Sequence, residues 1–213
     1  VRNGNDPVTA RVPRSAAAST VIVMAALILS KLTGQLREML IPSRIGFGML
    51  SDAFILGFIV PDLFYQLLVG GSVQAAVTPA LAGALSGNNE KKTWKSVSIF
   101  INVTASVMLA AVIAGEIVIP YILPLVSGDK SAQAVTLAAS VSAWLFPQVF
   151  FMMLAALAVG VLNAYKKFTA ASIGPVLYNL CVVMSMIIFG NKTAEGVRNV
   201  AFGILLSAVV YFL

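Results

Sequence analysis

Six apolar stretches, each long enough to cross a lipid bilayer, fill most of this chain of 213 residues. A membrane-spanning helix needs about 20 predominantly apolar residues, so six such helices use roughly 120. The composition agrees, because 59% of the residues are hydrophobic and 10% are charged, whereas soluble domains carry about 25% charged residues. The sequence therefore predicts an all-α bundle of six transmembrane helices and excludes a water-soluble globule.

Polar turns and prolines divide the predicted spans. The spans cover about residues 15–41, 49–85, 94–119, 132–162, 168–189 and 197–213. We expect Pro42 to close the first span and Pro120 and Pro124 to close the third, because proline cannot continue a helix. The second span is longer than a bilayer needs, and Pro61 and the pair Gly70–Gly71 predict that it is bent or broken.

Basic residues in the connections predict the orientation of the chain. Residues 1–14 are polar and lack the features of a signal peptide, which indicates a short cytoplasmic tail. This tail and the connections on its side of the membrane hold eight Lys and Arg residues, whereas the opposite connections hold four. The net charge of +6 is therefore a topology signal and gives no support to nucleic-acid binding. We expect residues 15–213 to form one transmembrane domain, and the apolar ending at Leu213 predicts a chain cut at the end of its sixth helix.

The residue inventory disfavours metal, redox and enzymatic chemistry. The sequence has no histidine and a single cysteine, Cys181, which removes the usual ligands for zinc, haem and iron–sulfur clusters. It also lacks a Gly-rich phosphate loop and paired carboxylates on an exposed loop. We expect no metal site, no cofactor and no enzymatic activity, and we leave open whether a coupling ion or the membrane potential takes part. Cys181 is most simply an apolar packing residue.

Charged side chains inside the first span are the strongest functional signal. A Lys or Arg at the centre of a membrane helix costs about 2.5–3.5 kcal/mol, so such residues usually face a cavity or a partner. Lys31 and Glu38 are separated by about 700° on a helix and so share one face, whereas Arg37 lies on another side. Ser30 adds a polar atom beside them. The alternative is that Lys31 snorkels and that Arg37 and Glu38 lie at the outer interface.

Polar residues of the second span extend the candidate site. Asp52, at the start of the span, is either a helix N-cap or first-turn acid, or the partner in a salt bridge to the first span. Asp62 either caps a restarted helix or faces a solvated vestibule. Tyr65, Gln66 and Gln74 complete the candidate cavity. With the cations of the first span, these residues predict a hydrophilic pocket suited to an anionic or zwitterionic group.

Two separated blocks of the sequence carry a family resemblance. The first block holds SKLTGQLRE at 30–38, SDAF at 51–54, PDL at 61–63, GSVQAA at 71–76 and TP at 78–79, and the second holds LAVGVLNAY at 157–165, Phe168 and GPVLYN at 174–179. In this order they resemble the MurJ (MviN) family of lipid II flippases, in the MOP exporter superfamily.

The resemblance implies a transporter of two six-helix lobes, with two additional helices in the MurJ group, around a cavity that opens alternately to each side. This chain resembles the first lobe, and the missing carboxy-terminal lobe is its implied partner. The implied cargo is lipid II, moved from the inner to the outer leaflet of the bacterial cytoplasmic membrane for peptidoglycan synthesis. On the same resemblance, Lys31 and Arg37 receive the diphosphate, and Glu38 and Asp52 occupy the family's acidic positions.

Departures from the family pattern leave other cargoes open. Tyr65 and Gln66 stand where a pair of arginines is common, and Gly70 stands where an acid is usual. Lys31 stands where arginine is usual, and lysine lacks the planar fork suited to phosphate oxygens. The alternatives are an exporter of another polyprenyl-linked oligosaccharide and a drug antiporter of the same superfamily. The antiporter ranks lower, because a cavity for cationic drugs favours acids, whereas the deepest charge here is that of Lys31.

Overall fold

The computed structural model describes residues 14–68, 78–79, 81, 83 and 90–213, and the regular elements in these ranges are all helical. In chain order they are α1 (Arg14–Leu40), the π-helical turn η1 (Ile41–Ile45), α2 (Met49–Leu68), α4 (Glu90–Val126), α5 (Ala132–Ala164), α6 (Phe168–Phe189) and α7 (Ala194–Phe212). Within these ranges, six stretches are long and apolar enough to cross a membrane, with α1 and η1 forming one of them. The predicted all-α, six-span architecture is confirmed, and the chain is a multi-pass membrane protein.

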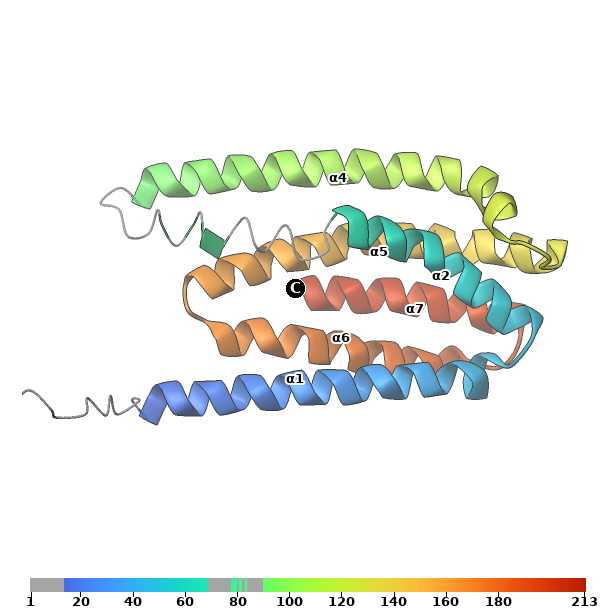
Figure 1. Ribbon diagram of the computed structural model, residues 1–213, viewed down its shortest axis with the longest axis horizontal. Helices are drawn as coiled ribbons and strands as arrows, with labels where there is room; N and C mark the ends of the chain where they lie inside the picture. The colour runs from blue at the N-terminus through green and yellow to red at the C-terminus, as the bar shows by residue number, and fades with distance from the viewer. Residues whose placement is uncertain (1–13, 69–77, 80, 82, 84–89) are drawn as a thin grey trace, which may run out of the picture.

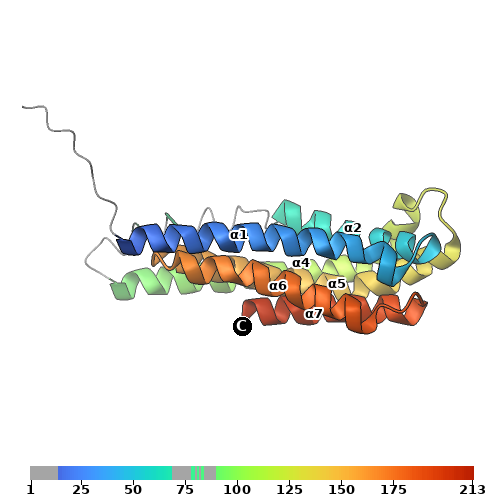
Figure 2. The ribbon, with the colours of Figure 1, turned by 90° about the horizontal axis from the view of Figure 1, so that it is seen from below.

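The bundle is centred on α5 (Figure 1). Helix α5 packs against α2, α4 and α7, and α6 packs against α7 and α1. Figure 2 shows α1 and α6 running beside each other from a second direction. In the most apolar 18-residue stretch of α5, 50% is buried inside the bundle, whereas the corresponding stretches of α1 and α4 are each 11% buried. The outer helices α1 and α4 therefore leave long apolar faces available to lipid.

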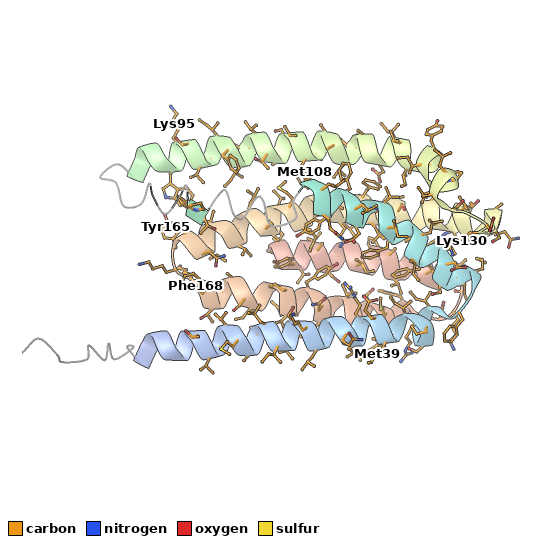
Figure 3. All side chains as sticks on the ribbon, viewed as in Figure 1. Met39, Lys95, Met108, Lys130, Tyr165 and Phe168 are labelled. Atoms are coloured by element: carbon orange, nitrogen blue, oxygen red, sulfur yellow. The ribbon has the colours of Figure 1, made fainter. Side chains whose placement is uncertain are left out.

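Basic side chains lie at both ends of the bundle. Lys95, near the start of α4, lies at the same end as Tyr165, which precedes the turn between α5 and α6 (Figure 3). Lys130, in the connection between α4 and α5, lies at the other end. The backbone of Lys192 donates a 3.1 Å hydrogen bond to the Arg44 carbonyl, which ties the α6–α7 turn to η1. The membrane segments thus separate two groups of cations.

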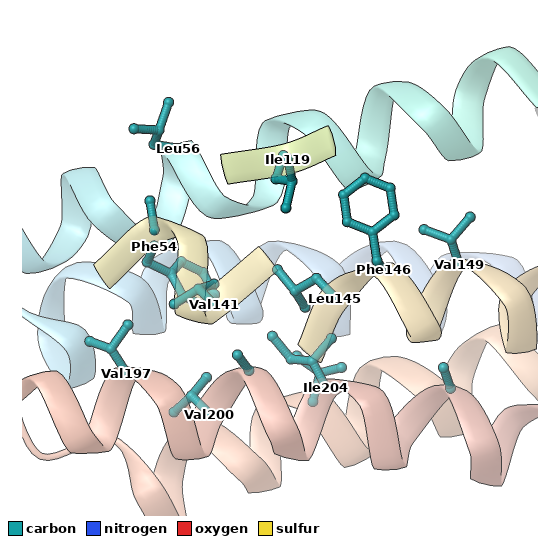
Figure 4. Packing of buried hydrophobic residues seen from close by; sticks show 14 of the residues in the cluster. Phe54, Leu56, Ile119, Val141, Leu145, Phe146, Val149, Val197, Val200 and Ile204 are labelled. Carbon is teal, nitrogen blue, oxygen red and sulfur yellow. The ribbon is translucent and has the colours of Figure 1, made fainter. Parts of the chain in front are cut away.

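An apolar core joins α2, α5 and α7. Phe146 of α5 and Ile204 of α7 are each 1% exposed and belong to this core (Figure 4). Helices α2 and α5 approach closely at Gly57, where a Cβ atom would lie 2.8 Å from the carbonyl oxygen of Ala138. The Ser142 hydroxyl also donates a 2.7 Å hydrogen bond to the carbonyl of Gly57. Small residues permit such contacts, which supply much of the packing between membrane helices.

Prolines end fewer helices than the sequence predicts. The expectation that Pro120 and Pro124 close the third span is wrong, because α4 continues through both to Val126. Pro42 does not close the first span at once either, since it lies within η1 and the chain turns at Gly46, with φ of 104°. Local π-helical adjustments and neighbouring groups satisfy the backbone atoms that a proline frees, so membrane helices tolerate it.

The second span is described in its first part, to Leu68, and at residues 78–79, 81 and 83. Helix α2 continues through Pro61 to Leu68 without ending at the proline. The predicted break at Gly70–Gly71 and the candidate cavity residue Gln74 lie outside the described residues. The last three predicted spans agree with α5, α6 and α7 to within three residues at each end.

Candidate functional site

A cleft lies between α1 and α2. The two helices are joined by η1 and diverge from it (Figure 1), because α1 packs on α6 and α2 packs on α5. The cleft has a volume of about 370 Å³, and α5, α6 and α7 also line it. This volume falls within the range of roughly 300–1,000 Å³ that is usual for ligand sites. Its polar lining consists of Arg37, Glu38, Asp62, Tyr65, Gln148 and Tyr178.

An ion pair forms the α1 wall of the cleft. The Nη2 and Nε atoms of Arg37 donate hydrogen bonds of 2.6 and 3.1 Å to the same oxygen of Glu38, Oε1. The side chain of Arg37 is 28% exposed and that of Glu38 is 52% exposed. A guanidinium carries five N–H donors, so Arg37 retains donors for an anionic oxygen. Glu38 is accessible, so an incoming anion can take its place beside Arg37.

The α2 wall of the cleft is acidic. Gln66 Nε2 donates a 2.7 Å hydrogen bond to Asp62 Oδ2, and Tyr65 lies beside them as a partly buried lining residue. Within the described lining, one basic side chain, Arg37, therefore stands against two acids, Glu38 and Asp62. The cleft as described is less cationic than the sequence analysis predicts.

A neutral hydrogen-bonded pair lies in the floor of the cleft. Gln148 of α5 and Tyr178 of α6 are each 7% exposed. The Nε2 atom of Gln148 donates a 2.8 Å hydrogen bond to the Tyr178 hydroxyl oxygen. Sequence reasoning missed both residues as site residues. A lone amide inside the apolar span of α5 is a signal that could have identified Gln148, whereas a tyrosine in a membrane helix gives no comparable signal.

Lys31 lies outside this lining. Its side chain is exposed, and the lining residues on α1 begin at Arg37. Because α1 is one continuous helix from Arg14 to Leu40, Lys31 shares the face of Glu38 and lies about 10 Å further from η1. This is the direction in which α1 and α2 diverge. The diphosphate-binding roles of Lys31 and Arg37 stay predictions, and the structure places Arg37 in the cleft.

Two further predicted residues contact neighbouring segments. Asn179 Nδ2 of α6 donates hydrogen bonds to the carbonyl oxygen of Ser30 at 3.1 Å and to its hydroxyl oxygen at 3.3 Å, which joins α1 to α6. Asp52 lies in the first turn of α2, and its carboxylate forms a 2.7 Å ion pair with Lys130 Nζ. The salt bridge of Asp52 is therefore with the α4–α5 connection and not with the first span.

The described groups suit binding of an amphiphile. In the part of the chain that the structure describes, no three His, Cys, Asp or Glu side chains gather where they could hold a metal ion. The cleft offers charged and hydrogen-bonding groups beside apolar surface from Phe54, Phe58 and Ile204. This combination can hold a polar head group while leaving an attached chain in apolar surroundings.

Comparisons with known proteins give close agreement on the family. A sequence profile described as "Lipid II flippase MurJ" matches residues 41–213. The chain is 28% identical over 188 residues to the lipid II flippase MurJ of Burkholderia cenocepacia, covering 87% of this chain and 36% of that protein. It is 27% identical over 187 residues to the probable lipid II flippase MurJ of Rhizobium tropici, covering 85% of this chain and 35% of that protein.

A solved structure shares the fold. It is described as lipid II flippase MurJ in an inward closed conformation, with a TM-score of 0.72 and 22% sequence identity, covering 90% of this chain and 40% of that one. The chain thus spans between 35% and 40% of the length of these three proteins. Lys31, Arg37 and Glu38 precede the part that the family profile matches. Since that part, residues 41–213, is well over half of the chain, the protein belongs to the lipid II flippase MurJ family.

Proposed function

We propose that this chain is a six-helix lobe of a flippase that moves lipid II from the inner to the outer leaflet of the bacterial cytoplasmic membrane. The observation that carries the proposal is the cleft between α1 and α2, which places Arg37 beside hydrogen-bonding and apolar surface in a bundle of the MurJ family. A polyprenyl diphosphate requires charge-assisted hydrogen bonds for its phosphate oxygens, and its prenyl chain requires apolar surroundings. The cleft offers both.

The proposed mechanism is alternating access with partner exchange at Arg37. In the structure, Glu38 holds the guanidinium through one oxygen. A phosphate oxygen of the cargo would replace Glu38, because a guanidinium binds phosphate with a planar fork of donors. The described lining carries two acids and one base, so the proposal assigns further positive charge to a second lobe facing the cleft. The cycle needs no cofactor, and a coupling ion or the membrane potential would set its direction.

Direct binding tests the proposed cargo. The full-length protein that contains this lobe, purified and placed in lipid nanodiscs, is expected to bind lipid II at least about tenfold more tightly than a polyprenyl diphosphate carrying a different glycan, a difference of about 1.4 kcal/mol. Native mass spectrometry with a titrated ligand measures both affinities. Equal affinities, or tighter binding of the other glycan, would exclude lipid II as the preferred cargo.

Thiol labelling tests the proposed orientation, in which the amino terminus is cytoplasmic. With Cys181 replaced by serine, one variant carries Gln133→Cys at the start of α5 and another carries Lys167→Cys at the turn before α6. In intact cells whose outer membrane has been made permeable, an impermeant maleimide should label position 133 and leave position 167 unlabelled until the inner membrane is opened. The reverse pattern would show that the basic connections face outward, against the usual cytoplasmic excess of Lys and Arg.

A further inference from the structure

The hydroxyl of Tyr178 has a fixed direction in the floor of the cleft. A tyrosine hydroxyl has one proton to donate and lone pairs that accept. Because Gln148 Nε2 already donates to the Tyr178 oxygen at 2.8 Å, the hydroxyl proton points away from Gln148. In the described part of the chain, nothing accepts that proton, and both residues line the cleft. The pair thus presents an unused donor to whatever occupies the cleft.

Tyr178 also lies between the two charged walls. It lines the same cleft as Arg37 of α1 and as Asp62 and Tyr65 of α2. A group held by Arg37 therefore lies in the same cleft as the Tyr178 hydroxyl. A neutral donor in this position is favourable for an anion, because it contributes a hydrogen bond without the cost of burying a second cation.

The charge of the lining makes such a donor necessary. Among the described lining residues Arg37 is opposed by Glu38 and Asp62, so charge alone attracts an anion weakly. A phosphate group has several oxygens, and a single guanidinium leaves some of them without a partner. Buried polar oxygens without hydrogen bonds destabilise a complex. The Tyr178 hydroxyl is a neutral donor in the cleft floor that can supply one of these hydrogen bonds.

We propose that Tyr178 donates a hydrogen bond to a phosphate oxygen of the cargo held by Arg37, and that Gln148 is the positioning residue that directs this hydroxyl. The inference rests on the proposed function, since it names the group that recognises the cargo's phosphate. It assigns Tyr178 to phosphate recognition and leaves the glycan to other parts of the protein. The competing explanation is purely structural, in that the pair only ties α5 to α6.

The test compares three ligands: farnesol, farnesyl diphosphate, which adds the diphosphate, and lipid II, which has in addition a glycan and a longer prenyl chain. The full-length protein with Tyr178→Phe is expected to bind farnesyl diphosphate and lipid II about tenfold more weakly, while binding of farnesol is unchanged. Gln148→Leu should weaken binding of the two phosphate ligands about threefold, because the hydroxyl remains but is free to rotate. The double variant should lose no more than Tyr178→Phe alone, since both substitutions act on one hydrogen bond.

Tyr211→Phe is the matched control. Tyr211 of α7 contacts Tyr178, with ring centroids 6.1 Å apart, and it lies outside the cleft lining. Its substitution should change none of the three affinities. The melting temperature of Tyr211→Phe, measured in the same nanodiscs, should stay close to that of the unmodified protein, because Tyr→Phe preserves the ring.

Distinct results overturn the inference and the proposed function. If the unmodified protein binds lipid II but Tyr178→Phe binds it equally well, Tyr178 has no part in recognition while the proposed function stands. Weaker binding of farnesol by the same factor would show a structural role. A loss confined to lipid II would assign the hydroxyl to a part of lipid II that farnesyl diphosphate lacks, and not to the phosphate. If the unmodified protein binds neither phosphate ligand, the proposed function and this inference both fail.

Discussion

Replacing Arg37 with alanine is expected to abolish rescue of bacterial cells depleted of their own lipid II flippase. Arg37 is the basic side chain that the described cleft lining contains, and it opposes two acids. Hydrogen bonds to charged groups contribute about 1.5–3 kcal/mol each, so losing the guanidinium should lower affinity for the phosphate about 100-fold. Colony formation after depletion, with expression of the variant checked by immunoblot, measures the effect.

Two further variants separate charge from geometry at this position. Arg37→Lys keeps the charge but loses the planar fork that matches phosphate oxygens, so we expect partial rescue. Arg198→Ala removes an exposed arginine of α7 whose Nε donates a 3.1 Å hydrogen bond to Ser140, outside the cleft lining, and should rescue fully. Full rescue by a well-expressed Arg37→Ala variant would remove Arg37 from the transport mechanism.

The number of helices could be predicted because hydropathy is a local property of each segment. The apolar runs alone identify the six spans, and α5, α6 and α7 agree with the prediction closely. Helix ends at proline could not be predicted in the same way. Whether a helix continues past Pro120 and Pro124, or turns through η1 after Pro42, depends on groups that satisfy the freed backbone atoms, and the local sequence does not contain them.

The candidate site could be predicted in part, because the cost of a charge in lipid is also a local property of the sequence. Charges in lipid are costly whatever the fold, so Arg37, Glu38 and Asp62 could be selected from the sequence, and the structure brings them to one cleft. The partners of Ser30 and Asp52 come from α6 and from the α4–α5 connection. Those partners depend on helix packing, which periodicity within one helix does not determine.

The neutral pair in the cleft floor also depends on helix packing, which could not be predicted from the sequence. Gln148 and Tyr178 are 30 residues apart in the sequence, and neither carries a charge that makes it costly in a membrane helix. Their significance comes from the meeting of α5 and α6 in the cleft that Arg37 also lines. Lys31 gives the opposite case, because its charge was evident from the sequence but its exposed position beyond the cleft lining was not.

Replacing Gly57 is expected to cause a large loss of folded protein. A Cβ atom at this position would lie 2.8 Å from the Ala138 carbonyl oxygen and 2.8 Å from Val141 Cγ1. The carbonyl belongs to the backbone of α5 and cannot rotate away, so α2 and α5 must separate. Overpacking typically costs about 1–3 kcal/mol. Gly57→Ala should lower the melting temperature of the purified protein, and Gly57→Leu should leave little monodisperse protein after size-exclusion chromatography.

Gly34→Ala is the matched control, because it adds the same methyl group to another membrane helix. A Cβ atom at Gly34 would lie 3.8 Å from Asn179 Nδ2, which is an ordinary van der Waals contact, so the melting temperature should not fall. Equal stability of the two alanine variants would contradict the close α2–α5 contact. Because that contact also positions the α2 wall carrying Asp62 and Tyr65, Gly57→Ala protein that remains folded should bind lipid II more weakly, which links the packing of the lobe to its binding site.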